Sequence, residues 1–268
     1  MRRPLLLLFT ALSTNAACGG WGGGTKWVEQ PLVPEEERAP LDGQIAGGTG
    51  GPIQPSSRTI GGRPSPRESA AERAGGGRVL GTFRNTYYDF PSEADHTGPP
   101  VSLMSGSCQA IAKVPRGFFE AVCVQGSGAL ARGGTVSFAK RDCACAEICP
   151  RTNQRICFDA LDKATFPWGR GAAGTAITPL RSVAADTQVL PMGTVLYIPE
   201  LDGVAVTGQA ASDGCFVVED RGLKVQGEHV DIFTGQPSQT AALNAQVPSN
   251  QGVTVILDAP RCAHLAKR

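Results

Sequence analysis

The stretch VVEDRGLKVQGEHVDIFTG, residues 217–235, places two aspartates in β-type surroundings. Asp220 ends one apolar run, and Asp231 lies inside the segment HVDIF, residues 229–233. A buried strand normally has a hydrophobic residue at such a position. An acid there therefore either faces solvent or has a chemical role, and the rest of the chain bears on which.

The N-terminal residues have the layout of a secretory signal. A short basic stretch, an apolar run too short to span a bilayer and small residues precede Cys18 in MRRPLLLLFTALSTNAAC. This resembles the cleavage and lipidation site of bacterial lipoproteins, so we expect residues 1–17 to be removed and Cys18 to carry lipid. Gly19 in place of aspartate favours the periplasmic face of the outer membrane. Plain secretion is the alternative.

The other eight cysteines agree with export. An even number of cysteines behind a secretory signal predicts four disulfides, with 105 possible connectivities. A zinc site in the cluster CACAEIC is the alternative, but its spacing is not the usual paired C-x2-C and it contains no histidine. We therefore predict disulfides, no metal and no cofactor; the cysteines are Cys108, Cys123, Cys143, Cys145, Cys149, Cys157, Cys215 and Cys262.

Composition divides the chain into a linker and one domain. Residues 18–77 are rich in glycine, proline, serine and charge, with too few apolar residues to offset the entropy of ordering, so we expect a disordered, lipid-anchored tether. Residues 78–268 form one domain with a cysteine-rich insertion. The net charge of +1, without a basic stripe, argues against a nucleic-acid partner.

Short β-prone runs separated by glycine and proline predict an all-β barrel or sandwich in this domain. One helix is expected over 238–245 with a serine or threonine cap. The expected strands lie in 78–90, 118–128, 133–140, 193–199, 214–220, 229–233 and 252–257.

One resemblance is specific. Residues 178–199, TPLRSVAADTQVLPMGTVLYIP, and the strand pair that ends at residue 235 resemble the 3D domain, named for three aspartates. Here these are Asp186, Asp220 and, eleven residues after the second, Asp231. The segment VQGSGAL, residues 124–130, extends the similarity to the membrane-bound lytic transglycosylase A family.

The resemblance implies a six-stranded double-psi β-barrel with its core at 175–257, and a groove that binds peptidoglycan glycan strands. It implies that Asp231 is the catalytic acid and base, that Asp220 supports it, and that Asp186 is structural. His229, predicted on the same strand face as Asp231, and the glycines Gly222 and Gly227 are further candidates for supporting or contacting substrate.

The chemistry fits an aspartate at position 231. A carboxyl group can protonate a glycosidic oxygen near neutral pH only if its pKa is raised. Apolar neighbours and the charge of Asp220 would both raise the pKa of Asp231. A lytic transglycosylase needs one such group, because the sugar's own 6-hydroxyl closes a 1,6-anhydro ring without water.

Other interpretations stay open at this point. Strand alternation could direct Asp231 to solvent, and Asp220 could simply cap a turn. Tyr87, Tyr88 and Trp168 could stack on sugars or only pack. A non-catalytic wall-binding lipoprotein is the alternative function, because only residues 101–166 are available for a second wall of the groove; hydrolysis of another exported β-glucan is a weaker one.

Overall fold

The computed structural model describes residues 72–266. The predicted signal peptide, Cys18 and most of the predicted tether fall outside the described residues. Between residues 72 and 266, no helix is both long and apolar enough to cross a membrane.

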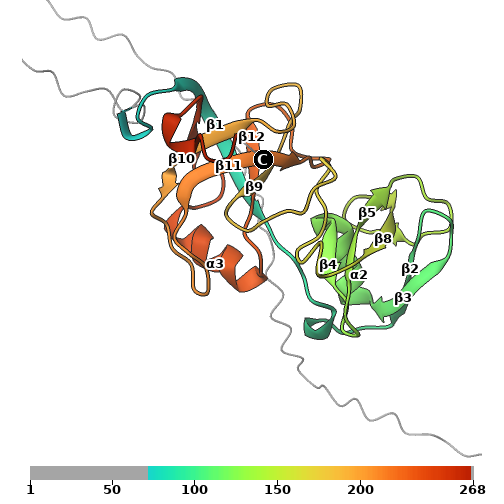
Figure 1. Ribbon diagram of the computed structural model, residues 1–268. Helices are drawn as coiled ribbons and strands as arrows, with labels where there is room; N and C mark the ends of the chain where they lie inside the picture. Colours follow the sequence, from blue (N-terminus) through green and yellow to red (C-terminus); the bar gives the residue numbers. More distant parts are fainter. Residues whose placement is uncertain (1–71, 267–268) are drawn as a thin grey trace, which may run out of the picture. The chain divides into compact units, whose positions relative to one another are not determined.

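Six strands close into a barrel in the spatial order β1-β12-β9-β11-β10-β13 (Figure 1). Their bounds are β1 Arg78–Tyr88, β9 Ser182–Ala185, β10 Val195–Asp202, β11 Asp213–Asp220, β12 His229–Phe233 and β13 Val253–Leu257. The pairs β1–β12 and β9–β11 are parallel, and the other four pairs are antiparallel. The fold class predicted from the sequence is confirmed.

The barrel interior is filled by alternate residues of its strands. Val230 and Ile232 of β12 are fully buried there with Phe83 of β1 and Phe216 of β11. Side chains of a strand alternate between its two faces, so His229, Asp231 and Phe233 face the outside of the barrel wall. The outer face of this part of the wall is therefore where β12 presents its polar residues.

Helix α3, Pro237–Gln246, lies beside the barrel, as the sequence predicts (Figure 1). Its cap differs from the prediction. Gln236 is the N-cap and forms a capping box with Gln239, while Pro237 is the first helical residue. Proline is favoured there because its missing N–H would have no partner within the helix, and this moves the helix start one residue ahead of Ser238.

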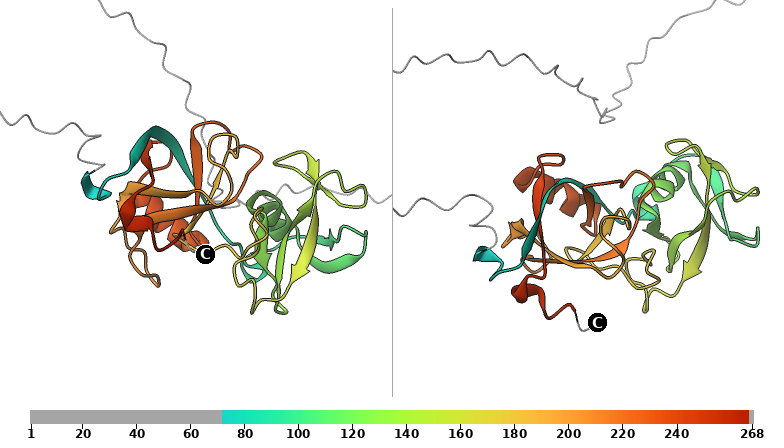
Figure 2. Two further views of the ribbon diagram at one scale, coloured as in Figure 1. Left: turned by 45° about the horizontal axis from the view of Figure 1, so that its top comes forward. Right: turned by 90° about the horizontal axis from the view of Figure 1, so that it is seen from above.

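The remaining elements form a separate group between β1 and β9, which we call the cysteine-rich group, residues 100–161. Figure 2 shows the elements of this group, in green to yellow-green, from two further directions. Small antiparallel sheets and one helix pack there around Val101, Leu103, Phe118 and Phe158. Its elements are β2 Pro100–Met104, β3 Ala110–Pro115, α2 Arg116–Gln125, β4 Ser127–Ala129, β5 Thr135–Lys140, β6 Ile148–Cys149, β7 Gln154–Arg155 and β8 Cys157–Leu161.

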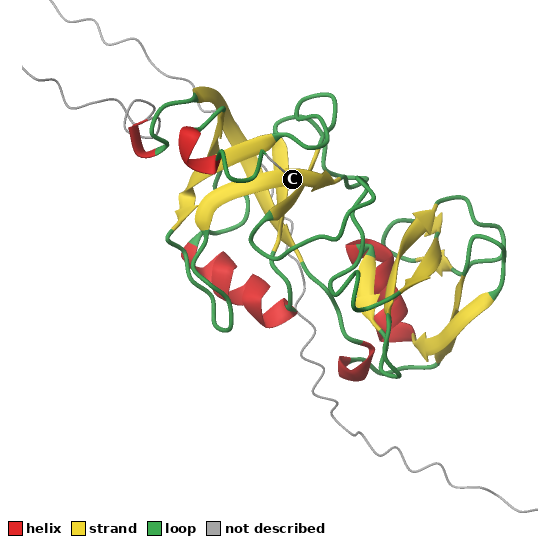
Figure 3. Ribbon diagram, in the orientation of Figure 1, coloured by secondary structure: helices red, strands yellow, loops and turns green. Residues whose placement is uncertain are grey.

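Two 3-10 turns, η1 (Glu93–Asp95) and η2 (Pro260–Cys262), complete the described elements, and strands and loops predominate in Figure 3.

The prediction of a strand over 118–128 is wrong for most of its length. Residues 116–125 form α2, whose buried residues Phe118, Phe119, Val122 and Cys123 have helical spacing. Aromatic and β-branched residues favour strands, but burial of this stripe against the small sheets outweighs that preference. Only Ser127–Ala129 at its end is a strand, β4.

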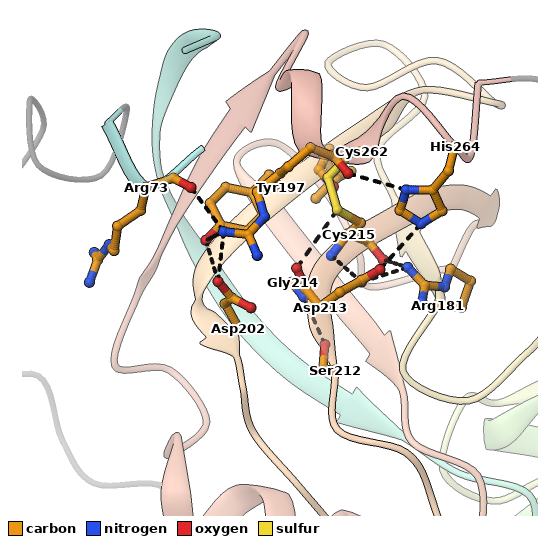
Figure 4. The surroundings of a disulfide bond; sticks show 12 residues. Arg73, Arg181, Tyr197, Asp202, Ser212, Asp213, Gly214, Cys215, Cys262 and His264 are labelled. Carbon is orange, nitrogen blue, oxygen red and sulfur yellow. Dashed lines mark hydrogen bonds and ion pairs between the residues drawn. A yellow bond between two sulfur atoms is a disulfide. The ribbon is translucent and has the colours of Figure 1, made fainter. Parts of the chain in front are cut away.

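All eight cysteines of the described part are paired, which confirms the prediction of four disulfides. Three of them, Cys108–Cys145, Cys123–Cys149 and Cys143–Cys157, lie within the cysteine-rich group. The fourth, Cys215–Cys262, joins β11 of the barrel to η2 near the end of the chain (Figure 4).

Candidate active site

The two aspartates of the opening stretch are brought to opposite sides of one small residue. Asp231 of β12 and Asp220 of β11 are both in register with Ala184 of the intervening strand β9, and Asp231 is also in register with Thr86 of β1. We call Asp220, Ala184, Asp231 and Thr86 the aspartate row. With strands about 4.8 Å apart, the backbones of the two aspartates are about 10 Å apart.

A register irregularity puts Asp220 in this row. Val218 pairs with Val183, yet Asp220 pairs with Ala184, the very next residue of β9, so Glu219 is the extra residue of a bulge. Val218 and Val183 are both in the barrel core. Without the bulge, alternation would direct Asp220 into that core with Val218; the bulge re-aims its carboxyl group toward the outer face.

Asp231 is held at one oxygen. The Thr86 hydroxyl donates to Asp231 Oδ1 at 2.7 Å, and the same hydroxyl oxygen lies 2.8 Å from Nε2 of His229. A threonine hydroxyl has only one proton, so while Thr86 donates to Asp231, His229 must donate to Thr86. The buried His229 therefore fixes Thr86, and Thr86 fixes one oxygen of Asp231.

Burial raises the pKa of Asp231 to about 6 from the ordinary 3.8. That value is the net result: the Thr86 hydrogen bond and the positive charge of Arg84 oppose the rise, while the negative charges of Asp220 and Asp89 contribute to it. Asp231 points away from Val230 and Ile232, as strand alternation predicts. It is only partly exposed to solvent, because neighbouring residues cover this outer face.

Asp220 has a different environment. Burial raises its pKa as well, but three donors favour its charged form. Its Oδ1 accepts the backbone N–H groups of Arg221 at 2.8 Å and Ala172 at 3.0 Å, and its Oδ2 accepts the Tyr88 hydroxyl at 3.4 Å. Both oxygens are thus in use, while Asp231 accepts a hydrogen bond at Oδ1 alone within the described residues.

Asp186 lies away from this pair and serves a loop. Its carboxylate accepts N–H groups of Gln188 at 3.0 Å and of Gly227 at 2.8 Å, and these bonds lower its pKa. Gly227 adopts φ +65°, a conformation that favours glycine. Asp186 thereby holds the loop that leads into β12.

Gly222 belongs to the same loop and makes room for a side chain. A Cβ added at this position would lie 2.6 Å from Cγ2 of Val225, which is itself buried. Gly222 and Gly227 therefore both shape the loop that leads from β11 into β12, the strand that contains Asp231.

The aromatic residues are used mainly for packing. Tyr88 is buried and its ring centroid lies 5.0 Å from that of Phe233. Trp168 packs edge-on with Phe90 and Phe233, at centroid distances of 5.5 and 6.2 Å. Tyr87 donates to the carbonyl of Val247 at 2.6 Å.

Sequence reasoning missed Thr86 and Asp89. Thr86 lies near the end of β1 and Asp89 directly follows that strand, far from the three aspartates in sequence, and only the parallel β1–β12 pairing brings Thr86 beside Asp231. Asp89 accepts the Thr240 hydroxyl at 3.2 Å and has its pKa raised by burial. In the sequence, the only sign of these residues was the polar Thr86 within the β-prone run RNTYYDF, residues 84–90.

The chain was compared with known proteins and solved structures. A search of curated proteins found no match. Solved structures with a similar arrangement include Escherichia coli MltA with bound chitohexaose, at 16% identity and TM-score 0.46, covering 67% of this chain and 72% of that one. Another is a membrane-bound lytic murein transglycosylase of Agrobacterium tumefaciens, at 15% identity and TM-score 0.43, with coverage of 69% and 76%. Identities and TM-scores this low do not assign an activity.

The family model of the 3D domain matches residues 181–256, a range that includes Asp186, Asp220 and Asp231. The matched range holds β9 to β12 and most of β13, whereas β1 with Thr86 precedes it. The chain therefore contains a 3D domain at residues 181–256, as its aspartate spacing indicated.

Proposed function

We propose that this protein is a peptidoglycan lytic transglycosylase that cleaves the glycan strand to 1,6-anhydro products with Asp231 as its single acid and base. The observation that carries the proposal is the asymmetry of the two carboxyl groups in the aspartate row. Asp231 has a pKa raised to about 6 and little hydrogen bonding, while Asp220 is engaged at both oxygens.

In the first step, protonated Asp231 gives its proton to the glycosidic oxygen as the bond from C1 to that oxygen breaks. The sugar ring then carries positive charge, which the Asp220 carboxylate helps to stabilise across Ala184. In the second step, Asp231, now charged, takes the proton of the 6-hydroxyl while O6 bonds to C1. The proton balance closes on Asp231, and no water is consumed.

The hydrogen bonds to Asp220 support this reaction over hydrolysis. A hydrolase needs a second carboxylate free to activate water or to attack carbon. Two backbone N–H groups hold Oδ1 of Asp220, and the Tyr88 hydroxyl lies 3.4 Å from Oδ2, so this carboxylate is fixed in place and stabilised in its charged form. A fixed, hydrogen-bonded carboxylate suits electrostatic support instead.

We further propose that the protein acts outside the cytoplasm, on the periplasmic face of the outer membrane, through lipid on Cys18. Four disulfides among eight cysteines support an oxidising compartment. The segment predicted as a tether, residues 18–77, would let the domain over 78–268 reach the wall from that anchor.

The test is digestion of purified sacculi by residues 72–268, with soluble products identified by mass spectrometry. Wild type should release anhydro-muropeptides, and Asp231→Asn should release them at least about 100-fold more slowly, because an amide cannot donate or accept the proton. Asp95→Asn is the matched control: it makes the same change at an exposed aspartate of η1 and should keep full activity.

Equal release by wild type and Asp231→Asn would contradict the assignment of the acid. Binding to sacculi without any soluble product from wild type would instead establish the alternative, a non-catalytic wall-binding lipoprotein.

A further inference from the structure

A concave site lies outside the aspartate row. It is a pocket of about 560 Å³, within the usual size range for a small-molecule site. Its lining includes Trp168, Arg181, Gln209, Ala210, Gln236 and Gln239.

The pocket is tied to the aspartate row through Phe233. Leu180, which also lines the pocket, donates its backbone N–H to the carbonyl of Phe233 at 2.8 Å, and the Trp168 ring packs against the Phe233 ring. Phe233 is two residues beyond Asp231 on β12, a separation of about 7 Å along a strand. A chain molecule that reacts at Asp231 is long enough to reach the pocket with an adjacent unit.

The charge in the pocket is already neutralised. Arg181 is its one charged lining residue, and the guanidinium donates to Asp213 at 2.7 Å and also to the carbonyl of Cys215 (Figure 4). Asp213 lies in addition 3.2 Å from His264. An anionic ligand would therefore have to compete with an existing ion pair, which disfavours carboxylates and phosphates.

The polar lining includes three glutamines, two of which, Gln209 and Gln236, keep hydrogen-bonding capacity. Gln209 uses its amide nitrogen on the carbonyl of Thr234 at 2.9 Å, which leaves its amide oxygen as an acceptor. The backbone N–H of Gln236 donates to Oε1 of Gln239 at 2.7 Å, and the side-chain amide nitrogen of Gln236 remains a donor. Amide donors and acceptors together with the indole of Trp168 match a ligand that has hydroxyl groups and an apolar face.

From these observations we propose that the pocket is a subsite for an uncharged sugar ring of the glycan, with the ring against Trp168 and its hydroxyl or acetamido groups bonded to Gln209 and Gln236. The proposal rests on the proposed function, since it places a neighbouring sugar of the same strand. Under this proposal the pocket binds glycan and does not bind the charged peptide stems of the wall.

The experiment measures binding of chitotetraose, a neutral tetramer of N-acetylglucosamine, by calorimetry in the Asp231→Asn background, so that turnover does not consume the probe. Ala210→Trp and Ala211→Trp, at two exposed positions of the pocket lining, should each fill it and weaken binding at least tenfold. Ala245→Trp, at an exposed position of α3 outside the lining, should leave the affinity unchanged.

Unchanged affinity in both pocket variants would overturn the subsite, as would the absence of chitotetraose binding to Asp231→Asn. A sugar-free stem peptide that binds Asp231→Asn and is lost in Ala210→Trp, with chitotetraose unaffected, would also overturn it. Release of anhydro-muropeptides by wild type is measured in a separate experiment. A result that contradicts the subsite can therefore be distinguished from one that contradicts the proposed function.

Discussion

The barrel and the cysteine-rich group are stabilised in different ways. The barrel is closed, so every strand has two neighbours, and it encloses a continuous apolar core that extends from β1 to β13. The cysteine-rich group has only two- and three-stranded sheets, a smaller core and three disulfides within about 50 residues. Small units that bury little surface commonly depend on such crosslinks.

This difference explains where the polar chemistry lies. A closed barrel with a full core can tolerate two partly desolvated carboxyl groups on its outer face, since their cost is spread over a large cooperative unit. The cysteine-rich group has a smaller core, and its fully buried side-chain hydrogen bond, at 2.7 Å between Ser127 and Ser137, joins neutral groups.

Removing a disulfide should give the largest change in stability, and the cysteine-rich group offers the first case. The double variant Cys123→Ala/Cys149→Ala opens a loop of 26 residues and removes two buried side chains from the core. We expect a loss of about 3 kcal/mol in the free energy of unfolding, measured by urea denaturation. Chain entropy alone would give the barrel variant Cys215→Ala/Cys262→Ala a loss of similar size.

The two double variants should differ in what unfolds. Hydrogen exchange should show loss of protection confined to residues 100–161 in the first variant, with β9 to β12 still protected. Equal loss of protection in both regions would show that they unfold as one unit, and it would contradict the view that the barrel and the cysteine-rich group are stabilised separately.

The second prediction concerns the pH dependence of barrel stability. Because the pKa of Asp231 is about 6 in the folded state and near 3.8 when unfolded, the folded state binds more protons between these values, and its stability falls as pH rises through that window. Asn at position 231 carries no charge. The variant Asp231→Asn should therefore gain stability relative to wild type as pH rises from about 4 to about 7.

Thermal unfolding of both proteins across this range measures the difference. A difference that does not change with pH would mean that Asp231 has an ordinary pKa in the fold. Asp95→Asn, at an exposed position, should show no such pH-dependent gain.

The smallest effect is expected at Thr86. Thr86→Val keeps the shape of the side chain but removes the hydroxyl that donates to Asp231 and contacts His229. Stability should fall by about 1 kcal/mol, and the pKa of Asp231 should rise because a bond to its charged form is lost. The upper limb of the pH–rate profile should then move to higher pH. Thr82→Val, at an exposed position of the same strand, is the matched control and should leave the profile in place.

The parts of the fold that follow from local pattern could be predicted from the sequence. Alternation and turn residues indicated the barrel strands, and the eleven-residue spacing of Asp220 and Asp231 indicated the 3D domain. Helix α2 was mistaken for a strand because Phe118 and Val122 favour either state, and tertiary burial decided between them.

The site itself depends on features that sequence spacing does not contain. The bulge at Glu219 turns Asp220 to the outer face, and the parallel pairing of β1 with β12 supplies Thr86 from more than 140 residues away. Pairings between such distant segments are set by the whole barrel. The identity of the two aspartates was therefore predictable, whereas the partners that distinguish their environments were not.

The most direct test of the central claim is digestion of sacculi in water labelled with heavy oxygen, with the reducing-end products examined by mass spectrometry. We expect anhydro sugars that contain no label, because the 6-hydroxyl of the substrate replaces water as the nucleophile and Asp231 mediates both proton transfers. Products with one heavy oxygen at C1 would show that water attacks the sugar, and they would contradict a single-acid, water-free mechanism.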